Sequence, residues 1–266
     1  LIALSKLLGD NPVHVLVLGR GSNVVVSDRG WPGLVVRMGG TFSWIRPEAE
    51  PSSMCAGSAA SLPVVANWAA RRGLAGVEFF VAIPGSIGGA VRMNAGAHGG
   101  STADHLTEVR VLDLGTAAVR AVSAEDLSFD YRKSAIQPSE VVLDARFSLH
   151  EDDEQAIRAR MDSYRKHRAA TQPPPVQNAG SVFRNPPGDS AGRLVEATGL
   201  KGFAVGGASV STLHANFFIA RPGATAQDVF DLVQAVRERV REASGVDLTP
   251  EIHFAGEFDP PRTPSL

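Results

Sequence analysis

Residues 83–100 read Ile83-Pro-Gly-Ser-Ile-Gly-Gly-Ala-Val-Arg-Met-Asn-Ala-Gly-Ala-His-Gly-Gly100. Six of these residues are glycines, set among mostly small side chains between an apolar run and a polar segment. Glycine lets backbone N–H groups turn outward and lets the backbone approach a ligand closely. Because phosphates and diphosphates are the ligands that most need such a surface, the segment predicts a phosphate-binding loop.

A second glycine turn lies upstream, at Gly19-Arg-Gly-Ser-Asn23, directly after the β-branched run 13–18. It differs from the dinucleotide fingerprint G-x-G-x-x-G, because Val24 takes the place of the third glycine and a strand is expected next instead of a helix. The sequence G-x-x-x-x-G-K-[ST] does not occur either. Such a turn alone is more often structural, but two loops rich in Gly, Ser and Asn that fit neither pattern indicate another flavin or nucleotide fold.

The composition is that of a globular protein, since 266 residues, 44% hydrophobic and 20% charged, suit one large domain or two of ordinary size. A net charge of −2 without a basic block argues against a nucleic-acid partner. Cys55 is the single cysteine, which rules out an internal disulfide and fits a reducing compartment. No apolar run reaches the roughly 18 residues of a membrane helix, and no signal peptide is visible, so we expect a cytoplasmic protein without a membrane partner. The seven histidines lack metal-binding spacing, and no metal is expected.

Hydrophobic periodicity predicts helices at residues 1–8, 61–72, 151–170 and 225–244. Short β-branched or alternating runs predict strands at residues 13–18, 24–26, 34–37, 53–57, 109–114, 119–122 and 141–149. The last three alternate like antiparallel strands with one face in water. Thr225 and Asp228 resemble a capping box at the start of the final helix, and Gly245 ends it.

The composition of the sequence changes at Glu151-Asp-Asp-Glu154. After the predicted strands come a charged helix and the segment Thr171-Gln-Pro-Pro-Pro175. We therefore expect two domains, residues 1–148 and residues 149–266. Strands followed by mixed elements indicate an α+β fold.

Three further segments carry unusual polar residues: Tyr131-Arg-Lys-Ser134, Asn178-Ala-Gly-Ser-Val-Phe-Arg-Asn-Pro186 and Pro250-Glu251. Each alone suits an ordinary structural role, as a solvated turn, a turn with a capping serine, or a carboxylate that points to solvent. A nucleophilic serine would need a partnered base, and no G-x-S-x-G elbow is present. A serine that protonates a developing carbanion needs only its position and cationic neighbours.

In their order along the chain, these segments are similar to the UDP-N-acetylenolpyruvoylglucosamine reductase family, the MurB enzymes of peptidoglycan synthesis. The motifs that carry the resemblance are Leu18-Gly-Arg-Gly-Ser-Asn23, Ile83-Pro-Gly-Ser-Ile-Gly-Gly89, Met93-Asn-Ala-Gly-Ala-His-Gly99, Tyr131-Arg-Lys-Ser134, Ala179-Gly-Ser-Val-Phe-Arg-Asn-Pro186 and Pro250-Glu251-Ile252. Six motifs in the family's order are far more specific than any one alone. The short segment 192–214 looks like the type II form, which lacks an extra loop.

The resemblance implies an FAD-binding domain of the p-cresol-methylhydroxylase type, here residues 1–148, followed by a smaller α+β substrate-binding domain. It implies a flavoprotein oxidoreductase of cell wall biogenesis, and hence of cell shape and cell division. NADPH would reduce bound FAD, and the flavin N5 would pass hydride to the enolpyruvyl ether of UDP-N-acetylglucosamine enolpyruvate, giving UDP-N-acetylmuramate.

The resemblance also assigns roles to individual residues. Arg132 would pair with the charge that develops on the substrate, Glu251 would assist it, and Ser181 would protonate the carbon. Tyr131, Asn185 and Asn216 would lie near the substrate. The residues expected to line the FAD are Gly19, Arg20, Gly21, Ser22, Asn23, Pro84, Gly85, Ser86, Gly88, Gly89, Asn94, Ala95, Gly96 and Ala97.

The chain departs from the family pattern in three places. The family has N-terminal strands with a Thr-Thr-x-Arg-x-Gly-Gly-like segment ahead of the position of Leu1, and this part of the flavin domain is absent from the sequence. His253 stands where the family usually has arginine, which weakens a positive contact near the substrate. Arg20 stands where a glycine is common, so its side chain must point away from the flavin or contact a phosphate.

Two other functions stay open. The absent N-terminal segment and His253 suit a flavin- or UDP-sugar-binding homologue without catalysis, and His98 in the glycine loop suits an FAD-linked oxidase of the same fold. Ser181 and Glu251 have no place in the oxidase, so we favour the reductase. We expect a monomer whose partner is the small-molecule substrate.

Overall fold

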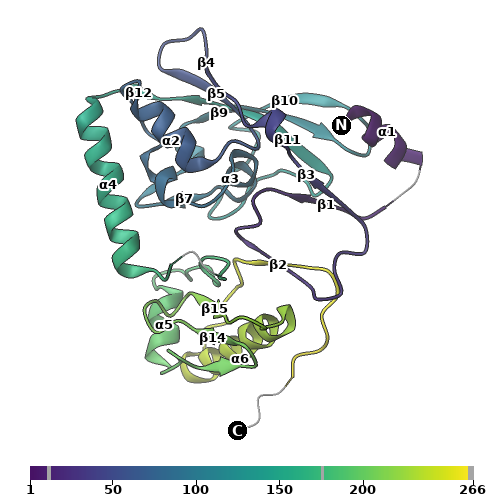
Figure 1. The fold of residues 1–266 in the computed structure, drawn as a ribbon, viewed down its shortest axis with the longest axis vertical. Helices are drawn as coiled ribbons and strands as arrows, with labels where there is room; N and C mark the ends of the chain where they lie inside the picture. Colours follow the sequence, from purple (N-terminus) through teal and green to yellow (C-terminus); the bar gives the residue numbers. More distant parts are fainter. Residues whose placement is uncertain (11–12, 175–176, 263–266) are drawn as a thin grey trace. The chain divides into compact units, whose positions relative to one another are not determined.

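The computed structural model describes residues 1–10, 13–174 and 177–262. The chain divides into two compact units (Figure 1), of which the first comprises residues 1–20 and 33–168 and the second residues 21–32 and 169–266. The predicted domain boundary at 148/149 lies just ahead of helix α4 (Glu154–Thr171), which begins in the first unit.

The first unit is built on a five-stranded antiparallel sheet in the order β10-β9-β11-β5-β4. Its strands are β4 (Ile45–Pro47), β5 (Ser53–Gly57), β9 (Leu106–Asp113), β10 (Val119–Ser123) and β11 (Glu140–Ser148). The central strand, β11, pairs with β9 on one side and β5 on the other. The strands predicted at 53–57, 109–114, 119–122 and 141–149 are therefore confirmed, each within three residues at its ends.

Both faces of the central strand β11 are covered. Helices α2 (Leu62–Ala70) and α3 (Ile87–Met93) pack on one face, where Val142 of β11 joins the main core. Helix α1 (Ile2–Asp10) and strand β1 (Val15–Leu18) pack against the other face, beside Val141. Because neighbouring strand residues point to opposite faces, β11 is buried on both sides, and the prediction that this strand exposes one face to water is wrong.

Short elements complete the first unit. Strand β1 pairs in parallel with β3 (Leu34–Arg37), and β6 (Leu74–Ala75) pairs with β12 (His150–Glu151). The remaining ones are the strands β7 (Gly96–Ala97) and β8 (Gly100–Ser101) and the 3₁₀ turns η1 (Gly40–Phe42), η2 (Glu78–Ala82) and η3 (Thr102–Asp104). The charged helix α4 buries Ile157 and Met161 at the helical spacing that the sequence predicts.

The second unit packs helices on a small antiparallel sheet, β13-β14-β15. Its elements are α5 (Ala191–Ala197), β13 (Ala204–Val205), β14 (Ala208–Val210), β15 (Phe218–Ala220), α6 (Ala226–Ser244) and β16 (His253–Ala255). Helix α6 begins with the predicted capping box of Thr225 and Asp228, and the left-handed Gly245 follows its last residue. Its buried stripe includes Leu232 and Val236.

Residues 21–32 join this second unit although they lie near the start of the sequence. Strand β2 (Val24–Val26) pairs in parallel with β16, with Val24 opposite His253. The carboxylate of Asp28 then accepts hydrogen bonds from the first two backbone N–H groups of α6, at 2.9 and 3.1 Å. These bonds satisfy donors that have no partner inside the helix.

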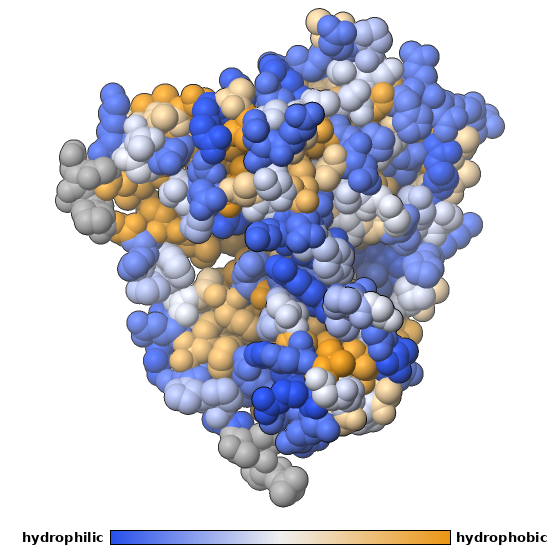
Figure 2. All heavy atoms as spheres, turned by 180° about the vertical axis from the view of Figure 1, so that it is seen from behind, coloured by the Kyte–Doolittle hydropathy of each residue, from blue (hydrophilic) through white to orange (hydrophobic). Residues whose placement is uncertain are grey.

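Exposed apolar side chains gather where α1 meets β3 in the first unit, and Figure 2 shows an apolar area on this unit. They surround a hollow of about 570 Å³, lined by Leu4, Leu7, Leu8, Val13, Gly33 and Leu34. Leu7 is 62% exposed there.

Among the described residues, no helix is both long enough and apolar enough to cross a membrane.

Candidate active site

The glycine-rich stretch 83–100 folds into a bend, helix α3 and the β7–β8 hairpin. Gly96 pairs with Ser101 in this hairpin, and a Cβ atom on Gly96 would lie 2.6 Å from the carbonyl oxygen of Gly100. Only glycine permits that approach without a shift of the backbone. The residues Gly96 and Ala97, predicted to line the flavin, thus form a tight strand pair.

Two neighbouring segments fix the hairpin. Asn94 ends α3 in a left-handed conformation (φ 40°), and its side-chain amide accepts a bond from the N–H of Ala103 and donates one to the carbonyl of Asp130. At the tip, the ring of His98 stacks on Tyr164 of α4, with centroids 4.2 Å apart. Burial and the charge of His167 lower the pKa of His98. Asn94, predicted as a cofactor-binding residue, therefore also has a structural role.

The turn that carries Tyr131 and Arg132 lies against this hairpin. Arg132 has a φ of 58°, which is strained for a non-glycine residue. Its Nη2 donates a 3.0 Å hydrogen bond to the carbonyl of Gly96, and its guanidinium lies 4.9 Å from the ring centroid of Tyr131. Strain of this kind persists where the surrounding structure holds it, often at functional sites.

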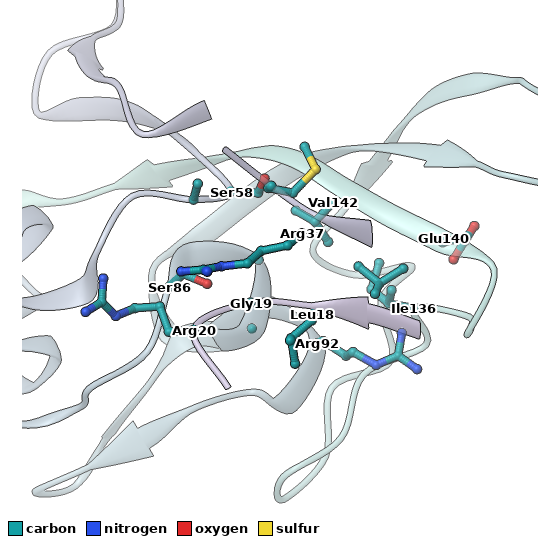
Figure 3. Close-up of a pocket in the computed structure, with 15 residues that line it drawn as sticks. Leu18, Gly19, Arg20, Arg37, Ser58, Ser86, Arg92, Ile136, Glu140 and Val142 are labelled. Carbon is teal, nitrogen blue, oxygen red and sulfur yellow. The ribbon is translucent and has the colours of Figure 1, made fainter. Parts of the chain in front are cut away.

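A cavity of about 110 Å³ lies in the first unit, where the carboxyl ends of the parallel strands β1 and β3 meet α3 (Figure 3). Of the predicted cofactor residues, it is lined by Gly19, Arg20, Ser86, Gly88 and Gly89. Pro84 and Gly85 precede α3 in the same segment, and Ala95 follows it.

Sequence reasoning missed several residues that line this cavity, among them Arg37, Ser58, Arg92 and Glu140. Arg37 is the last residue of β3, and Ser58 follows the last residue of β5. A polar residue where a predicted strand ends was the signal that could have identified both. The set of guanidinium, hydroxyl and glycine groups suits the diphosphate of FAD, because these groups donate hydrogen bonds and carry positive charge.

The remaining residues of the first glycine turn, Gly21, Ser22 and Asn23, belong to the second unit. There the side-chain amide of Asn23 donates a 3.1 Å bond to the carbonyl of Glu251, and the backbone carbonyl of Asn23 accepts one from the N–H of His253. Asn23 thus holds the segment that carries a predicted catalytic carboxylate.

Ser181 and Glu251 lie on adjacent segments of the second unit. Ser181 forms a β-bridge with Phe217, and the N–H of Glu251 donates a 2.7 Å bond to the carbonyl of Val182, the next residue after Ser181. Both predicted catalytic residues are partly exposed. The second unit therefore brings together two of the three predicted catalytic positions, while Arg132 belongs to the first unit.

Asn216 is 4% exposed, and its side chain is engaged by the protein itself. Its Oδ1 accepts from the N–H of Phe183 at 2.9 Å, and its Nδ2 donates to the carbonyl of Phe183 at 2.8 Å. The N–H of Asn216 donates to Nδ1 of His214, a ring whose pKa is lowered chiefly by burial. Asn185 likewise accepts from the N–H of Ala191 at the start of α5. Both asparagines, predicted to bind substrate, thus have structural bonds that support the Ser181 segment.

Two family comparisons agree with this architecture. Residues 1–123 match the family described as an FAD binding domain, and residues 172–255 match the C-terminal domain of UDP-N-acetylenolpyruvoylglucosamine reductase. The fold and the matched domains thus define a flavoprotein oxidoreductase that binds FAD.

Comparison with whole proteins leads to the same family. The chain is 43% identical to UDP-N-acetylenolpyruvoylglucosamine reductase of Rubrobacter xylanophilus, over 97% of this chain and 86% of that protein. It is 41% identical to the Myxococcus xanthus enzyme of that name, over 97% and 83%. The crystal structure of the reductase (MurB) from Thermus caldophilus superposes with a TM-score of 0.82 at 36% identity, covering 95% of this chain and 90% of that one. The chain belongs to the UDP-N-acetylenolpyruvoylglucosamine reductase family, which confirms the resemblance and the fold class.

Proposed function

We propose that this chain catalyses the NADPH-dependent reduction of UDP-N-acetylglucosamine enolpyruvate to UDP-N-acetylmuramate, a step of peptidoglycan synthesis in the cytoplasm. FAD, when bound, would supply the redox chemistry, a net hydride transfer from NADPH to the enolpyruvyl double bond. The observation that carries the proposal is the strained Arg132, whose guanidinium is hydrogen-bonded to the Gly96 carbonyl within the glycine hairpin of the FAD-binding domain.

Arg132 stabilises the negative charge that develops on the substrate carboxylate when hydride adds to the neighbouring double bond. A planar guanidinium suits this task, because it can bind both oxygens of a carboxylate. The bond to Gly96 and the packing on Tyr131 orient the guanidinium in advance, so that little rearrangement is needed during reaction.

Ser181 delivers the proton that completes the reduction, so that one hydride and one proton add across the double bond. Glu251, whose backbone N–H is bonded to the carbonyl of Val182 next to Ser181, assists Arg132 in stabilising the charge that develops on the substrate. Tyr131, Asn185 and Asn216 lie on or support the segments that contact the substrate.

The test separates the two half-reactions. Purified protein should show the flavin absorbance bands, and NADPH should bleach them. In Ser181→Ala the bleaching should proceed at the normal rate, while reoxidation by the enolpyruvyl substrate should slow by about 10²–10⁴-fold, the usual contribution of a positioned acid. Ser209→Ala, on β14 of the same unit, serves as the matched control.

Each outcome has a clear meaning. Reoxidation of Ser181→Ala at the normal rate would refute the role of this serine. A colourless protein that cannot be loaded with FAD would refute the enzymatic function and favour a UDP-sugar-binding homologue. A flavin that stays attached after denaturation, and is reoxidised by oxygen, would favour the oxidase.

A further inference from the structure

One hydroxyl in the wall of the first-unit cavity has no hydrogen bond. Ser58 is 3% exposed, and its Oγ is buried with no partner among the residues that the structure describes. A buried hydroxyl without a partner is destabilising, because it has lost its bonds to water. The position of Ser58 on the cavity wall gives a reason for it, since a ligand in the cavity can supply the missing acceptor.

Two cations at the same cavity also lack partners. Within residues 1–10, 13–174 and 177–262, the guanidinium of neither Arg20 nor Arg37 has a hydrogen bond or an ion pair. Arginines elsewhere in this unit are paired, as Arg110 is with Asp144 and Arg146 with Glu108. Figure 3 shows both Arg20 and Arg37 reaching toward the same end of the cavity.

The acidic residue of the cavity does not neutralise these cations. Glu140 lies at the opposite end in Figure 3. Its carboxylate is already bound by the guanidinium of Arg120 and by the N–H of Gln137. The end of the cavity with Arg20 and Arg37 is therefore positive, and it favours an anion.

The size of the cavity limits which part of a ligand it can hold. Its volume of about 110 Å³ is well below the roughly 300–1,000 Å³ of pockets that enclose a drug-sized ligand, so it suits one portion of a dinucleotide. Gly88 brings the backbone of α3 close to Ser58, since a Cβ there would lie 3.1 Å from the Ser58 Cβ. A diphosphate, with two negative charges and several acceptor oxygens, matches two guanidiniums, one unpaired hydroxyl and a glycine wall.

We propose that Arg37 and Ser58 are further cofactor-binding residues, which hold the diphosphate of FAD. The Ser58 hydroxyl donates to a phosphate oxygen, and Arg37 supplies positive charge together with Arg20. This inference rests on the proposed function, because it takes FAD as the occupant of the first unit.

Flavin titrations test the inference without turnover. FAD and riboflavin, which lacks phosphate, are titrated into deflavinated protein and followed by flavin fluorescence. Arg37→Gln should weaken FAD binding by about ten- to a hundredfold and leave riboflavin binding unchanged. Added NaCl should weaken FAD binding less in Arg37→Gln than in the wild type, because one screened charge is gone. Arg71→Gln, at an exposed arginine that directly follows α2, is the charge-matched control.

Ser58→Ala should have opposite effects on the stability of the FAD-free protein and on its affinity for FAD. Removal of an unpaired buried hydroxyl should raise the melting temperature of the FAD-free protein, whereas loss of the donor should weaken FAD binding by about fivefold or more. FAD affinities of Arg37→Gln and Ser58→Ala that stay within twofold of the wild type would overturn the inference, and so would an equal loss of riboflavin binding. A wild-type protein that binds no FAD would overturn the proposed function instead.

Discussion

The side chain of Asn216 allows a sharp test of the hydrogen bonds that hold the Ser181 segment in the second unit. Asn216→Leu keeps the approximate size of the side chain and removes both of its hydrogen bonds to Phe183. Phe183 is 1% exposed. The β-bridge between Phe183 and Pro250 is formed by the N–H of Arg184 and the carbonyl of Val182, so it does not use the N–H or the carbonyl of Phe183. The variant therefore leaves one buried N–H and one buried C=O without partners.

The size of the effect follows from that count. Each unsatisfied buried group costs about 1–3 kcal/mol, so the free energy of unfolding should fall by about 2–6 kcal/mol. For a chain of this length each 1 kcal/mol lowers the melting temperature by about 2–4 °C, and a fall of at least about 4 °C is expected.

Thermal unfolding of the FAD-free protein, followed by circular dichroism, measures this fall in the absence of substrate. Leu213→Ala, at a neighbouring side chain that is 49% exposed, is the control and should melt within 1 °C of the wild type. If Asn216→Leu melts like the control while its KM for the enolpyruvyl substrate rises tenfold, the amide faces the substrate and the structural role given to it here is wrong.

Three further predictions follow from single sites. Gly96→Ala should lower the free energy of unfolding by about 1–3 kcal/mol in urea titrations, since its Cβ would meet the Gly100 carbonyl at 2.6 Å; an unchanged midpoint would contradict the close strand pair. The pKa of His214 is lowered from its ordinary value of 6.5, so its neutral ring adds stability above that pH, which is lost as the pH falls through the lowered pKa; His214→Asn, with an amide oxygen as acceptor, should flatten the melting temperature between pH 7 and 5. Arg132→Lys should keep the melting temperature and lower kcat/KM by about tenfold or more, because lysine cannot bind a carboxylate through two donors; full activity would show that charge alone suffices.

Local patterns predicted the longer helices and strands, but they missed α3, α5 and the short strands β4, β13, β14 and β15. The run from Thr225 to Gly245 carries its own start and stop signals, a capping box and a glycine, and both appear in the structure. Strands 34–37 and 53–57 lie where β-branched or alternating residues predict them. The face that a strand exposes is harder to predict, because it depends on which elements cover it, and β11 is covered on both sides.

The candidate site was only partly predictable for the same reason. The glycine turns can be recognised from the sequence alone, since few other sequences place so many small residues together. Arg37 and Ser58 come from separate strands, and only the folded sheet brings them to one cavity. The amides of Asn94 and Asn216 have backbone partners 36 and 33 residues away along the chain, which no local pattern reveals.

The pairing of β2 with β16 has a consequence for how the protein is made. His253 is synthesised after its strand partner Val24, with an interval of roughly 10–45 s at about 5–20 residues per second. Once Ser148 has been synthesised, the five-stranded sheet of the first unit has all of its strands, whereas residues 21–32 still lack both their strand partner and the helix that Asp28 caps. The second unit can therefore be completed only after the five-stranded sheet of the first unit, although one of its own strands, β2, is synthesised before every strand of that sheet.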